Sequence, residues 1–234
     1  MERFATKFWC KRNDSRMIKK IKFITFLILI FFPTKIFALI EIDITRGNLN
    51  PLPIAVSALY TDNKTNEAFK KEIKVDNIGE EISSVIERNL KTTGLFNPLE
   101  KEAFLQKPDV AHLKPRFEDW ALIKAQALIT GKVEIKDEKV RVEFRLWDVL
   151  AAREMLALAF TTNPNNWRRI GHIISDKIYE RLTGEKGYFD TRIIYVSEKG
   201  PKTKRVKKLA IMDQDGFNTK YLTLGNELVL TPRF

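Results

Sequence analysis

The chain of 234 residues contains one cysteine, Cys10, which lies close to its start. A single cysteine cannot form a disulfide within the chain, and the residues after it offer no thiolate nucleophile or thiolate metal ligand. There are two histidines, and neither belongs to an HExxH motif. GxSxG and glycine-rich phosphate-binding motifs are also absent. We therefore predict that the protein is not an enzyme and that it has no catalytic residue, cofactor or metal ligand.

The other polar residues form no recognisable catalytic group. His112 lies in a proline-flanked loop and His172 lies in a predicted helix, and histidines without a partner at fixed spacing more often have a structural role. Carboxylates are spread along predicted solvated faces, namely Glu41, Asp43, Glu80 and Glu81. In the sequence DQDG at residues 213–216 the glycine comes too early for a calcium loop, so we predict a hairpin turn there.

Positive charge is concentrated at the start of the chain. The formal net charge is +11, but residues 1–38 hold nine lysines and arginines against two acidic residues and so account for most of it. A second basic run, KGPKTKRVKK at residues 199–208, has no interleaved aromatic residues. We interpret this run as a solvated hairpin connection, with phosphate binding as the alternative, and we predict no nucleic-acid partner.

Residues 1–38 have the layout of an export signal. Basic residues follow Met17, an apolar run at residues 23–32 ends at Pro33, and Ala38 supplies a small residue for cleavage. An apolar run this short is below the roughly 20 residues that span a bilayer, so a removed signal peptide is favoured over a membrane anchor. Because the basic region of an export signal is short, Met17 is a possible true start. We predict a periplasmic protein with no membrane insertion after cleavage.

A strand, a second strand and a helix are predicted directly after this leader. In residues 39–45 isoleucines alternate with polar residues, which is the period of a strand, and residues 53–59 form an apolar run suited to a buried strand. Residues 76–94 have the period of an amphipathic helix. Asn77 is its expected N-cap, and Gly94 is its expected C-terminal stop.

The following residues continue this alternation. We predict an apolar turn at residues 95–99, a short helix at 118–127, a β-hairpin of strands 127–136 and 140–148, a strand at 155–162 and a helix at 164–182 that Gly184 ends. Helices interleaved with strands indicate an α/β layer domain, which we place at residues 39–184.

From residue 185 the pattern becomes all-β. Strands are predicted at residues 192–196, 207–213 and 219–224 and from Val229, with a tight-turn signal at Asp215-Gly216. A short sheet of this kind has an apolar face and open edges and is seldom stable alone. We therefore predict an incomplete β-propeller blade at residues 185–234 and expect the chain to be the front part of a longer protein.

Six segments resemble, in order, those of the TolB family. They are SVIERNLKTTGLFNPL (84–99), ALITGKV (127–133), VRVEFRLWDV (140–149), GHIISDKIYERLTGEKGYFD (171–190), TRIIYV (191–196) and LAIMDQDGFN (209–218). The resemblance extends over residues 40–234. It implies a three-layer α/β domain with a mixed sheet, similar to anticodon-binding domains, followed by the start of a propeller.

The resemblance also implies a function. TolB proteins are periplasmic, non-enzymatic adaptors of the Tol–Pal system, which link inner-membrane TolA to outer-membrane Pal and support outer-membrane integrity, envelope constriction during cell division and macromolecule import. The C-terminal domain of TolA contacts the extended segment after the signal peptide. That segment corresponds here to Leu39, Ile40, Glu41, Ile42, Asp43, Ile44, Thr45 and Arg46. Pal docks on the propeller, of which this chain has the first strands, so Pal binding is in doubt.

Three alternatives stay open. The chain could be a decayed TolB fragment or a secreted soluble binding domain without Tol–Pal activity. An RNA-binding domain would fit the fold analogy and the charge, but the export signal argues against it. Finally, residues 39–45 could pair with the protein's own sheet as an edge strand instead of adding a strand to a partner.

Overall fold

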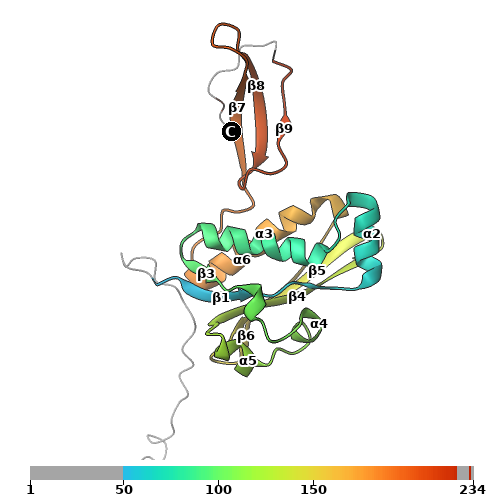
Figure 1. Ribbon diagram of the computed structural model, residues 1–234, viewed down its shortest axis with the longest axis vertical. Helices are drawn as coiled ribbons and strands as arrows, with labels where there is room; N and C mark the ends of the chain where they lie inside the picture. The colour runs from blue at the N-terminus through green and yellow to red at the C-terminus, as the bar shows by residue number, and fades with distance from the viewer. Residues whose placement is uncertain (1–49, 226–231, 233–234) are drawn as a thin grey trace, which may run out of the picture. The chain divides into compact units, whose positions relative to one another are not determined.

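The computed structural model describes residues 50–225 and 232, which form two β-sheets and the helices that cover the first of them (Figure 1). The first sheet consists of β1 (Leu52–Val56), β2 (Tyr60–Thr61), β3 (Phe96–Pro98), β4 (Ala127–Lys136), β5 (Lys139–Asp148) and β6 (Arg153–Thr162). The second consists of β7 (Arg192–Lys199), β8 (Val206–Asp213) and β9 (Lys220–Tyr221). The helices are α2 (Asn63–Ile73), α3 (Ile78–Thr92), α4 (Pro108–Ala111), α5 (Phe117–Leu122) and α6 (Trp167–Thr183), with 3-10 turns at η1 (Lys101–Ala103) and η2 (Pro164–Asn166).

The first sheet is mixed. Its strand order is β3-β1-β4-β5-β6, and β2 pairs with β4 beyond the end of β1. β1 runs parallel to β3 and β4, whereas β4, β5 and β6 form an antiparallel meander. Between β4 and β5, Asp137 and Glu138 both have positive φ, as a two-residue type I′ turn requires. The predicted hairpin is therefore confirmed, with its polar turn at the predicted place.

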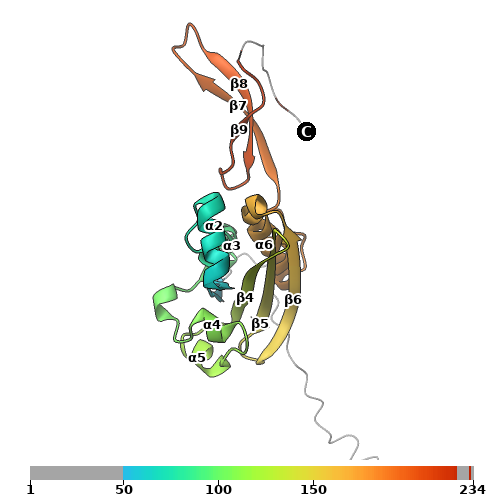
Figure 2. The same ribbon diagram turned by 90° about the vertical axis from the view of Figure 1, so that its right-hand side faces the viewer.

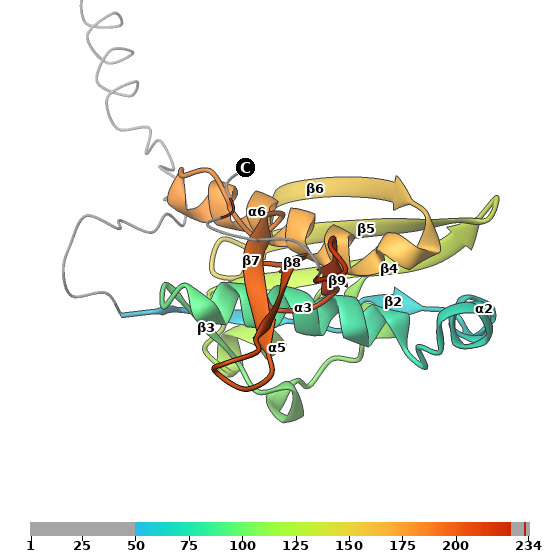
Figure 3. The ribbon, with the colours of Figure 1, turned by 90° about the horizontal axis from the view of Figure 1, so that it is seen from above.

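Helices cover both faces of this sheet (Figures 1 and 2). α3 and α6 lie side by side over one face (Figure 3) and enclose the larger core with the inward side chains of β5, which are Val140, Val142, Phe144 and Leu146. A smaller core around Trp120 and Leu128 lies on the opposite face, with α4 and α5. This is the three-layer α/β arrangement with a mixed sheet that the family resemblance implies, and it contains the α/β layers predicted from the sequence pattern.

Local sequence signals account for the ends of the two long helices. Asn77 caps α3, because its side-chain oxygen accepts a hydrogen bond from the Glu80 backbone amide at 3.2 Å. Gly94 follows α3 with a φ of 71°, and Gly184 caps α6 with a φ of 76°, a conformation that favours glycine. These caps are confirmed. The start of α6 is not, because Pro164–Asn166 forms a 3-10 turn and the α-helix begins at Trp167.

The structure corrects the predicted turn at residues 95–99. Residues 96–98 form β3, a strand parallel to β1. The backbone explains the difference, since Leu52 N donates to Leu95 O at 2.8 Å and Leu99 N donates to Ile54 O at 2.9 Å. These hydrogen-bond partners lie far away in sequence. The sequence around residues 95–99 shows only a short apolar run between a glycine and a proline, which does not by itself predict a strand.

Two helices also differ from the prediction. α5 ends at Leu122, well before the predicted end at residue 127, and Lys124 then adopts a φ of 63° that stops helical continuation. α2 is absent from the prediction, and the signal for it is Asp62, whose carboxylate accepts a hydrogen bond from Thr65 N at 2.7 Å. Hydrogen bonding with the Thr65 side chain and with its backbone amide lowers the pKa of Asp62, and the charges of Lys132 and Lys64 add to this effect.

The second sheet is open and antiparallel, in the order β7-β8-β9. β7 is longer than predicted, and β9 is shorter. The basic run at 199–208 is not a loop throughout, because Lys199 ends β7 and Val206 begins β8, which leaves residues 200–205 as the connection. The predicted β8–β9 turn is present, with a φ of 86° at Gly216. The sheet fits the predicted incomplete propeller blade.

The export signal at residues 1–38, the strand at 39–45 and the strand from Val229 lie outside the described residues. The structure therefore does not test those predictions. Of the helices between residues 50 and 225, none has the length and the apolar character needed to cross a membrane.

Candidate functional site

The candidate site is a polar cluster where α3 and α6 meet the β8–β9 turn. The two helices approach closely here because Gly171 has no side chain, and a Cβ at this position would lie 2.9 Å from Cγ1 of Val85. Three polar side chains fill the interior of the contact. They are Asn89 from α3 and His172 and Ser175 from α6, and each is at most 2% exposed.

Hydrogen bonds connect this cluster to the second sheet. The Asn89 amide nitrogen donates to Nδ1 of His172 and to Oγ of Ser175, each at 2.9 Å. Its oxygen accepts a hydrogen bond from Nε2 of Gln214, in the β8–β9 turn, at 3.0 Å. Ser175 in turn donates to the Gly171 carbonyl oxygen at 2.8 Å. A buried polar group of this kind is stable only while its partners are in place, so the cluster fixes the position of the turn.

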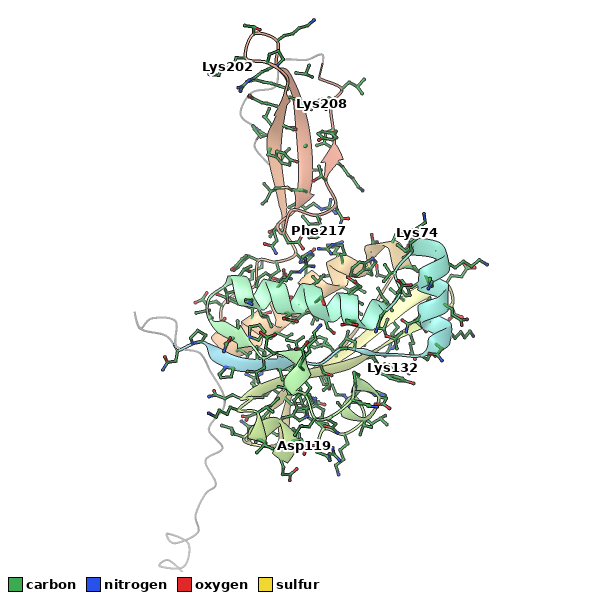
Figure 4. All side chains as sticks on the ribbon, in the orientation of Figure 1. Lys74, Asp119, Lys132, Lys202, Lys208 and Phe217 are labelled. Carbon is green, nitrogen blue, oxygen red and sulfur yellow. The ribbon has the colours of Figure 1, made fainter. Side chains whose placement is uncertain are left out.

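An ion pair and an aromatic contact hold the next residues of the turn. Arg168 donates to the Asp215 carboxylate, and both side chains are largely buried. The Arg168 guanidinium also lies 3.9 Å from the centre of the Phe217 ring, and Arg88 of α3 lies 5.2 Å from the same centre. Phe217 therefore lies between two cations, at the end of the second sheet that faces the helices (Figure 4).

The two ring nitrogens of His172 differ in their hydrogen bonding. Because Nδ1 accepts the Asn89 hydrogen bond, the ring proton lies on Nε2. Within the described residues Nε2 has no hydrogen-bond partner, and the nearest carboxylate oxygen, Oδ2 of Asp215, is 3.8 Å away. Burial lowers the pKa of His172, and the negative charges of Asp215 and Asp213 only partly oppose this effect. The neutral ring is therefore the favoured form at neutral pH.

His172 also lies close to two carboxylates that could share a metal ion with it. Ligand atoms of His172, Asp213 and Asp215 lie within 4.8 Å of one another, a spacing that could hold an ion. However, Arg168 already occupies the Asp215 carboxylate, and the Asn218 amide already donates to Asp213. A guanidinium bound to one of the ligands repels a divalent cation, so the donor set fits a metal poorly.

A carboxylate in α6 fixes the segment that leads into β7. Asp176 accepts hydrogen bonds from the backbone amides of Phe189 at 2.6 Å and Asp190 at 3.1 Å. Burial raises the pKa of Asp176, and these two hydrogen bonds oppose the shift. Gly187 allows the close approach, because a Cβ there would lie 2.4 Å from the Asp176 Cα atom. The segment between α6 and the second sheet is thus held against the helix.

A cavity of about 400 Å³ opens beside the cluster and is lined by both helix and strand residues. Its two acidic side chains are already paired, Asp190 with Arg169 at 2.9 Å and Asp213 with Arg192 at 4.0 Å. Paired carboxylates are poor general bases, and no nucleophile is hydrogen-bonded to a base along this lining. The arrangement suits a structural contact or polar recognition.

Comparisons with known proteins identify the family of this chain. Residues 40–155 match the TolB amino-terminal domain, and residues 179–234 match the TolB beta propeller domain. The Tol-Pal system protein TolB of Pelagibacter ubique (strain HTCC1062) is 77% identical to this chain over 209 residues. The chain belongs to the TolB family. The aligned residues make up 89% of the chain and 47% of that relative, so the chain spans about half the length of the curated relative that it matches.

A solved family structure supports the fold. The crystal structure of TolB from Acinetobacter baumannii matches with a TM-score of 0.58 and 23% sequence identity, over 78% of this chain and 41% of that chain. This likeness bears on the fold alone. The predicted family and fold class, a mixed α/β sheet domain followed by part of a propeller, are both confirmed.

The residues singled out from the sequence fall in different places. The predicted TolA-binding residues, Leu39 to Arg46, lie outside the described residues. His112 ends α4 and stacks on Tyr60 with 4.4 Å between the ring centres, and His172 is the buried histidine described above. Glu80 and Glu81 lie exposed in the first turn of α3. The structure therefore brings together only His172 and the DQDG turn.

Sequence reasoning missed Asn89, Ser175 and Gln214. One signal was available for Asn89, which occupies the helical position that follows Ile82 by seven residues and so lies on the apolar stripe of α3. A polar residue on a buried stripe needs a partner. Its partners are 83 and 86 residues away for His172 and Ser175, and no local pattern identifies them.

Proposed function

We propose that this protein is a periplasmic, non-enzymatic adaptor of the Tol–Pal system that binds TolA and serves outer-membrane integrity, envelope constriction during division and macromolecule import. The observation that carries the proposal is the 77% identity over 209 residues to a Tol-Pal system protein TolB. The paired carboxylates of the cavity support a role without catalysis.

The proposal divides the chain into an export signal at residues 1–38, an α/β domain at 39–184 and the first propeller strands at 185–234. Cleavage after Ala38 would place residues 39–46 at the new amino terminus. The strict alternation of Ile40, Ile42 and Ile44 with polar residues suits a segment that adds a strand to the C-terminal domain of TolA. Pal recognition belongs to the family's whole propeller, and the proposal for this chain is limited to TolA.

Deletion of residues 39–45 tests the proposal. We expect calorimetry to show at least about a hundredfold weaker binding of the TolA C-terminal domain, because the added strand supplies both the backbone hydrogen bonds and the side-chain contacts. The circular dichroism and the melting temperature of the α/β domain should stay nearly unchanged, since β1 begins only at Leu52.

A matched pair of variants separates the two faces of the segment. Replacing Ile40, Ile42 and Ile44 by asparagine should weaken TolA binding strongly, whereas changing Glu41 and Asp43 to their amides should have a smaller effect. Full TolA binding by the deletion variant would place the TolA site elsewhere. Unfolding of the α/β domain by the deletion would show that residues 39–45 are an internal strand.

A further inference from the structure

A continuous hydrogen-bond relay runs from an ionisable ring to the β8–β9 turn. It begins at Nδ1 of His172 in α6, passes through the Asn89 amide of α3 and ends at Nε2 of Gln214. The ring and the Asn89 side chain are each 2% exposed, so no bulk water can replace a lost partner inside the relay.

A second proton on the ring would reverse the first bond of the relay. Nδ1 would become a donor that faces the Asn89 amide nitrogen at 2.9 Å, and two donors at that distance repel. Asn89 could restore the bond by turning its amide so that the oxygen faces His172. Its nitrogen would then face Nε2 of Gln214, so Gln214 would in turn have to rotate or leave.

We propose that the contact between the helices and the β8–β9 turn is a proton-sensitive latch, in which neutral His172 holds Gln214 through Asn89 and the doubly protonated ring releases it. The inference rests on the geometry of the relay and is independent of the identity of any Tol–Pal partner.

Charged groups from every neighbouring element bear on this ring. The β8–β9 turn contributes Asp215 and, at its start, Asp213; α6 contributes Arg168 and Asp176; and the segment before β7 contributes Asp190. α3 contributes the uncharged Asn89. The acids favour the charged ring, whereas Arg168 opposes it and already neutralises Asp215. Burial outweighs the acids and lowers the pKa of His172 from its usual value of 6.5.

The sign of the pH effect follows from this pKa shift. Release of the turn gives the ring more contact with water and moves its pKa toward the usual value of 6.5, whereas burial in the closed latch keeps the pKa lower. The released state therefore binds more protons in the interval between the two values. The contribution of the latch is complete above about pH 6.5 and is lost as the pH falls toward the pKa of the closed state.

The test follows the ring and the turn together in the full chain. With two histidines in the chain, NMR of histidine-labelled protein can follow His172 alone once His112→Gln assigns the other signal. Hydrogen exchange at residues 213–218 is measured at about pH 7.5 and about pH 5 and corrected for the intrinsic exchange rates. Exchange in β4 and β5 serves as the reference. Protection should fall about tenfold for each unit by which the pKa of His172 is depressed, up to about thirtyfold at pH 5.

Three variants make the result decisive. His172→Gln keeps an acceptor for Asn89 but does not titrate, so the pH dependence at residues 213–218 should disappear, while His112→Gln should keep it. Asn89→Asp gives both the protonated ring and Gln214 an acceptor, so the pKa of His172 should rise by at least about one unit and the loss of protection at about pH 5 should shrink or disappear. A His172 pKa at or above 6.5 in the wild type, or pH dependence that survives in His172→Gln, would overturn the proposal.

Discussion

The two sheets of this protein are stabilised in different ways. In the first sheet, the first five residues of β4 and every second residue of β5 are buried, and residues such as Ile129 and Phe144 are completely inaccessible to water. In the second, Ala210 is the one residue of β7, β8 and β9 that is fully buried, and both described residues of β9 are exposed. The first sheet is thus held by apolar burial, whereas the contacts of the second with α3 and α6 are hydrogen bonds, an ion pair and cation–π contacts.

This difference has physical consequences. Apolar burial changes little with pH or salt, whereas ion pairs are screened by salt and buried hydrogen bonds depend on protonation. Within the described residues no layer covers the second sheet, and a small sheet needs a packed apolar face for independent stability. We therefore expect the second sheet to respond to solution conditions that leave the α/β domain unaffected.

The largest expected effect is loss of core packing in the first sheet. Leu90 is completely buried in the larger core, and Leu90→Ala should lower the free energy of unfolding by about 2–5 kcal/mol because it removes buried methyl groups and leaves a cavity. Denaturant melts of the two proteins measure this change. In the matched variant Ile194→Ala, at a half-buried position of β7, the loss should be below about 1 kcal/mol. Equal losses in both variants would contradict the difference between the sheets.

A smaller effect is expected in the segment that joins the two regions. Gly187→Ala would place a Cβ 2.4 Å from the Asp176 Cα, so either the backbone or α6 must shift. We expect a destabilisation of about 1–3 kcal/mol, as is typical when a packed site receives an extra group. Thermal melts should show this change, while Lys186→Ala, at the exposed neighbouring position, should stay within about 0.5 kcal/mol of the wild type. An unchanged melt for Gly187→Ala would mean that Asp176 does not hold the segment.

The smallest effect concerns the aromatic contact of the turn. Phe217 is 46% exposed and lies between Arg168 and Arg88, so Phe217→Ala should weaken the attachment of the β8–β9 turn by about 0.5–1 kcal/mol. Faster amide exchange at residues 213–218 would report the loss without a change in the global melt. Leu222→Ala, at a position 54% exposed, is the control and should leave exchange at that turn unaltered. Identical exchange in the wild type and Phe217→Ala would show that the cation–π contact does not stabilise the attachment of the turn.

The sequence allowed most of the first domain to be predicted because its signals are local. Each of these signals is formed by residues close together in sequence. Examples that the structure contains are the Asn77 cap, the alternation in β5 and the apolar stripe of α6. The failures have long-range causes. β3 forms only because β1 offers it a parallel partner, and α5 ends where the chain must turn to enter β4.

The candidate site was much less predictable. The sequence singles out both His172 and the DQDG turn, but as unrelated features, a structural histidine and a hairpin turn. Both interpretations are consistent with the structure, yet the relay between them depends on Asn89 and on the packing of α3 against α6. Side chains up to 125 residues apart meet in this cluster, and no spacing rule connects them.

Hydrogen exchange of the whole chain at neutral pH tests the difference between the sheets most directly. Amides of β4 and β5 should exchange only through global unfolding, since both strands are paired on each side and covered by helices. Amides of β7 and β8 should exchange through a separate opening of much lower free energy, because their sheet contacts the helices through polar groups and these two strands have one fully buried residue, Ala210. Equal protection in the two sheets, with one common dependence on denaturant, would show that they unfold as a single cooperative unit. That result would contradict the claim that the two sheets differ in stability.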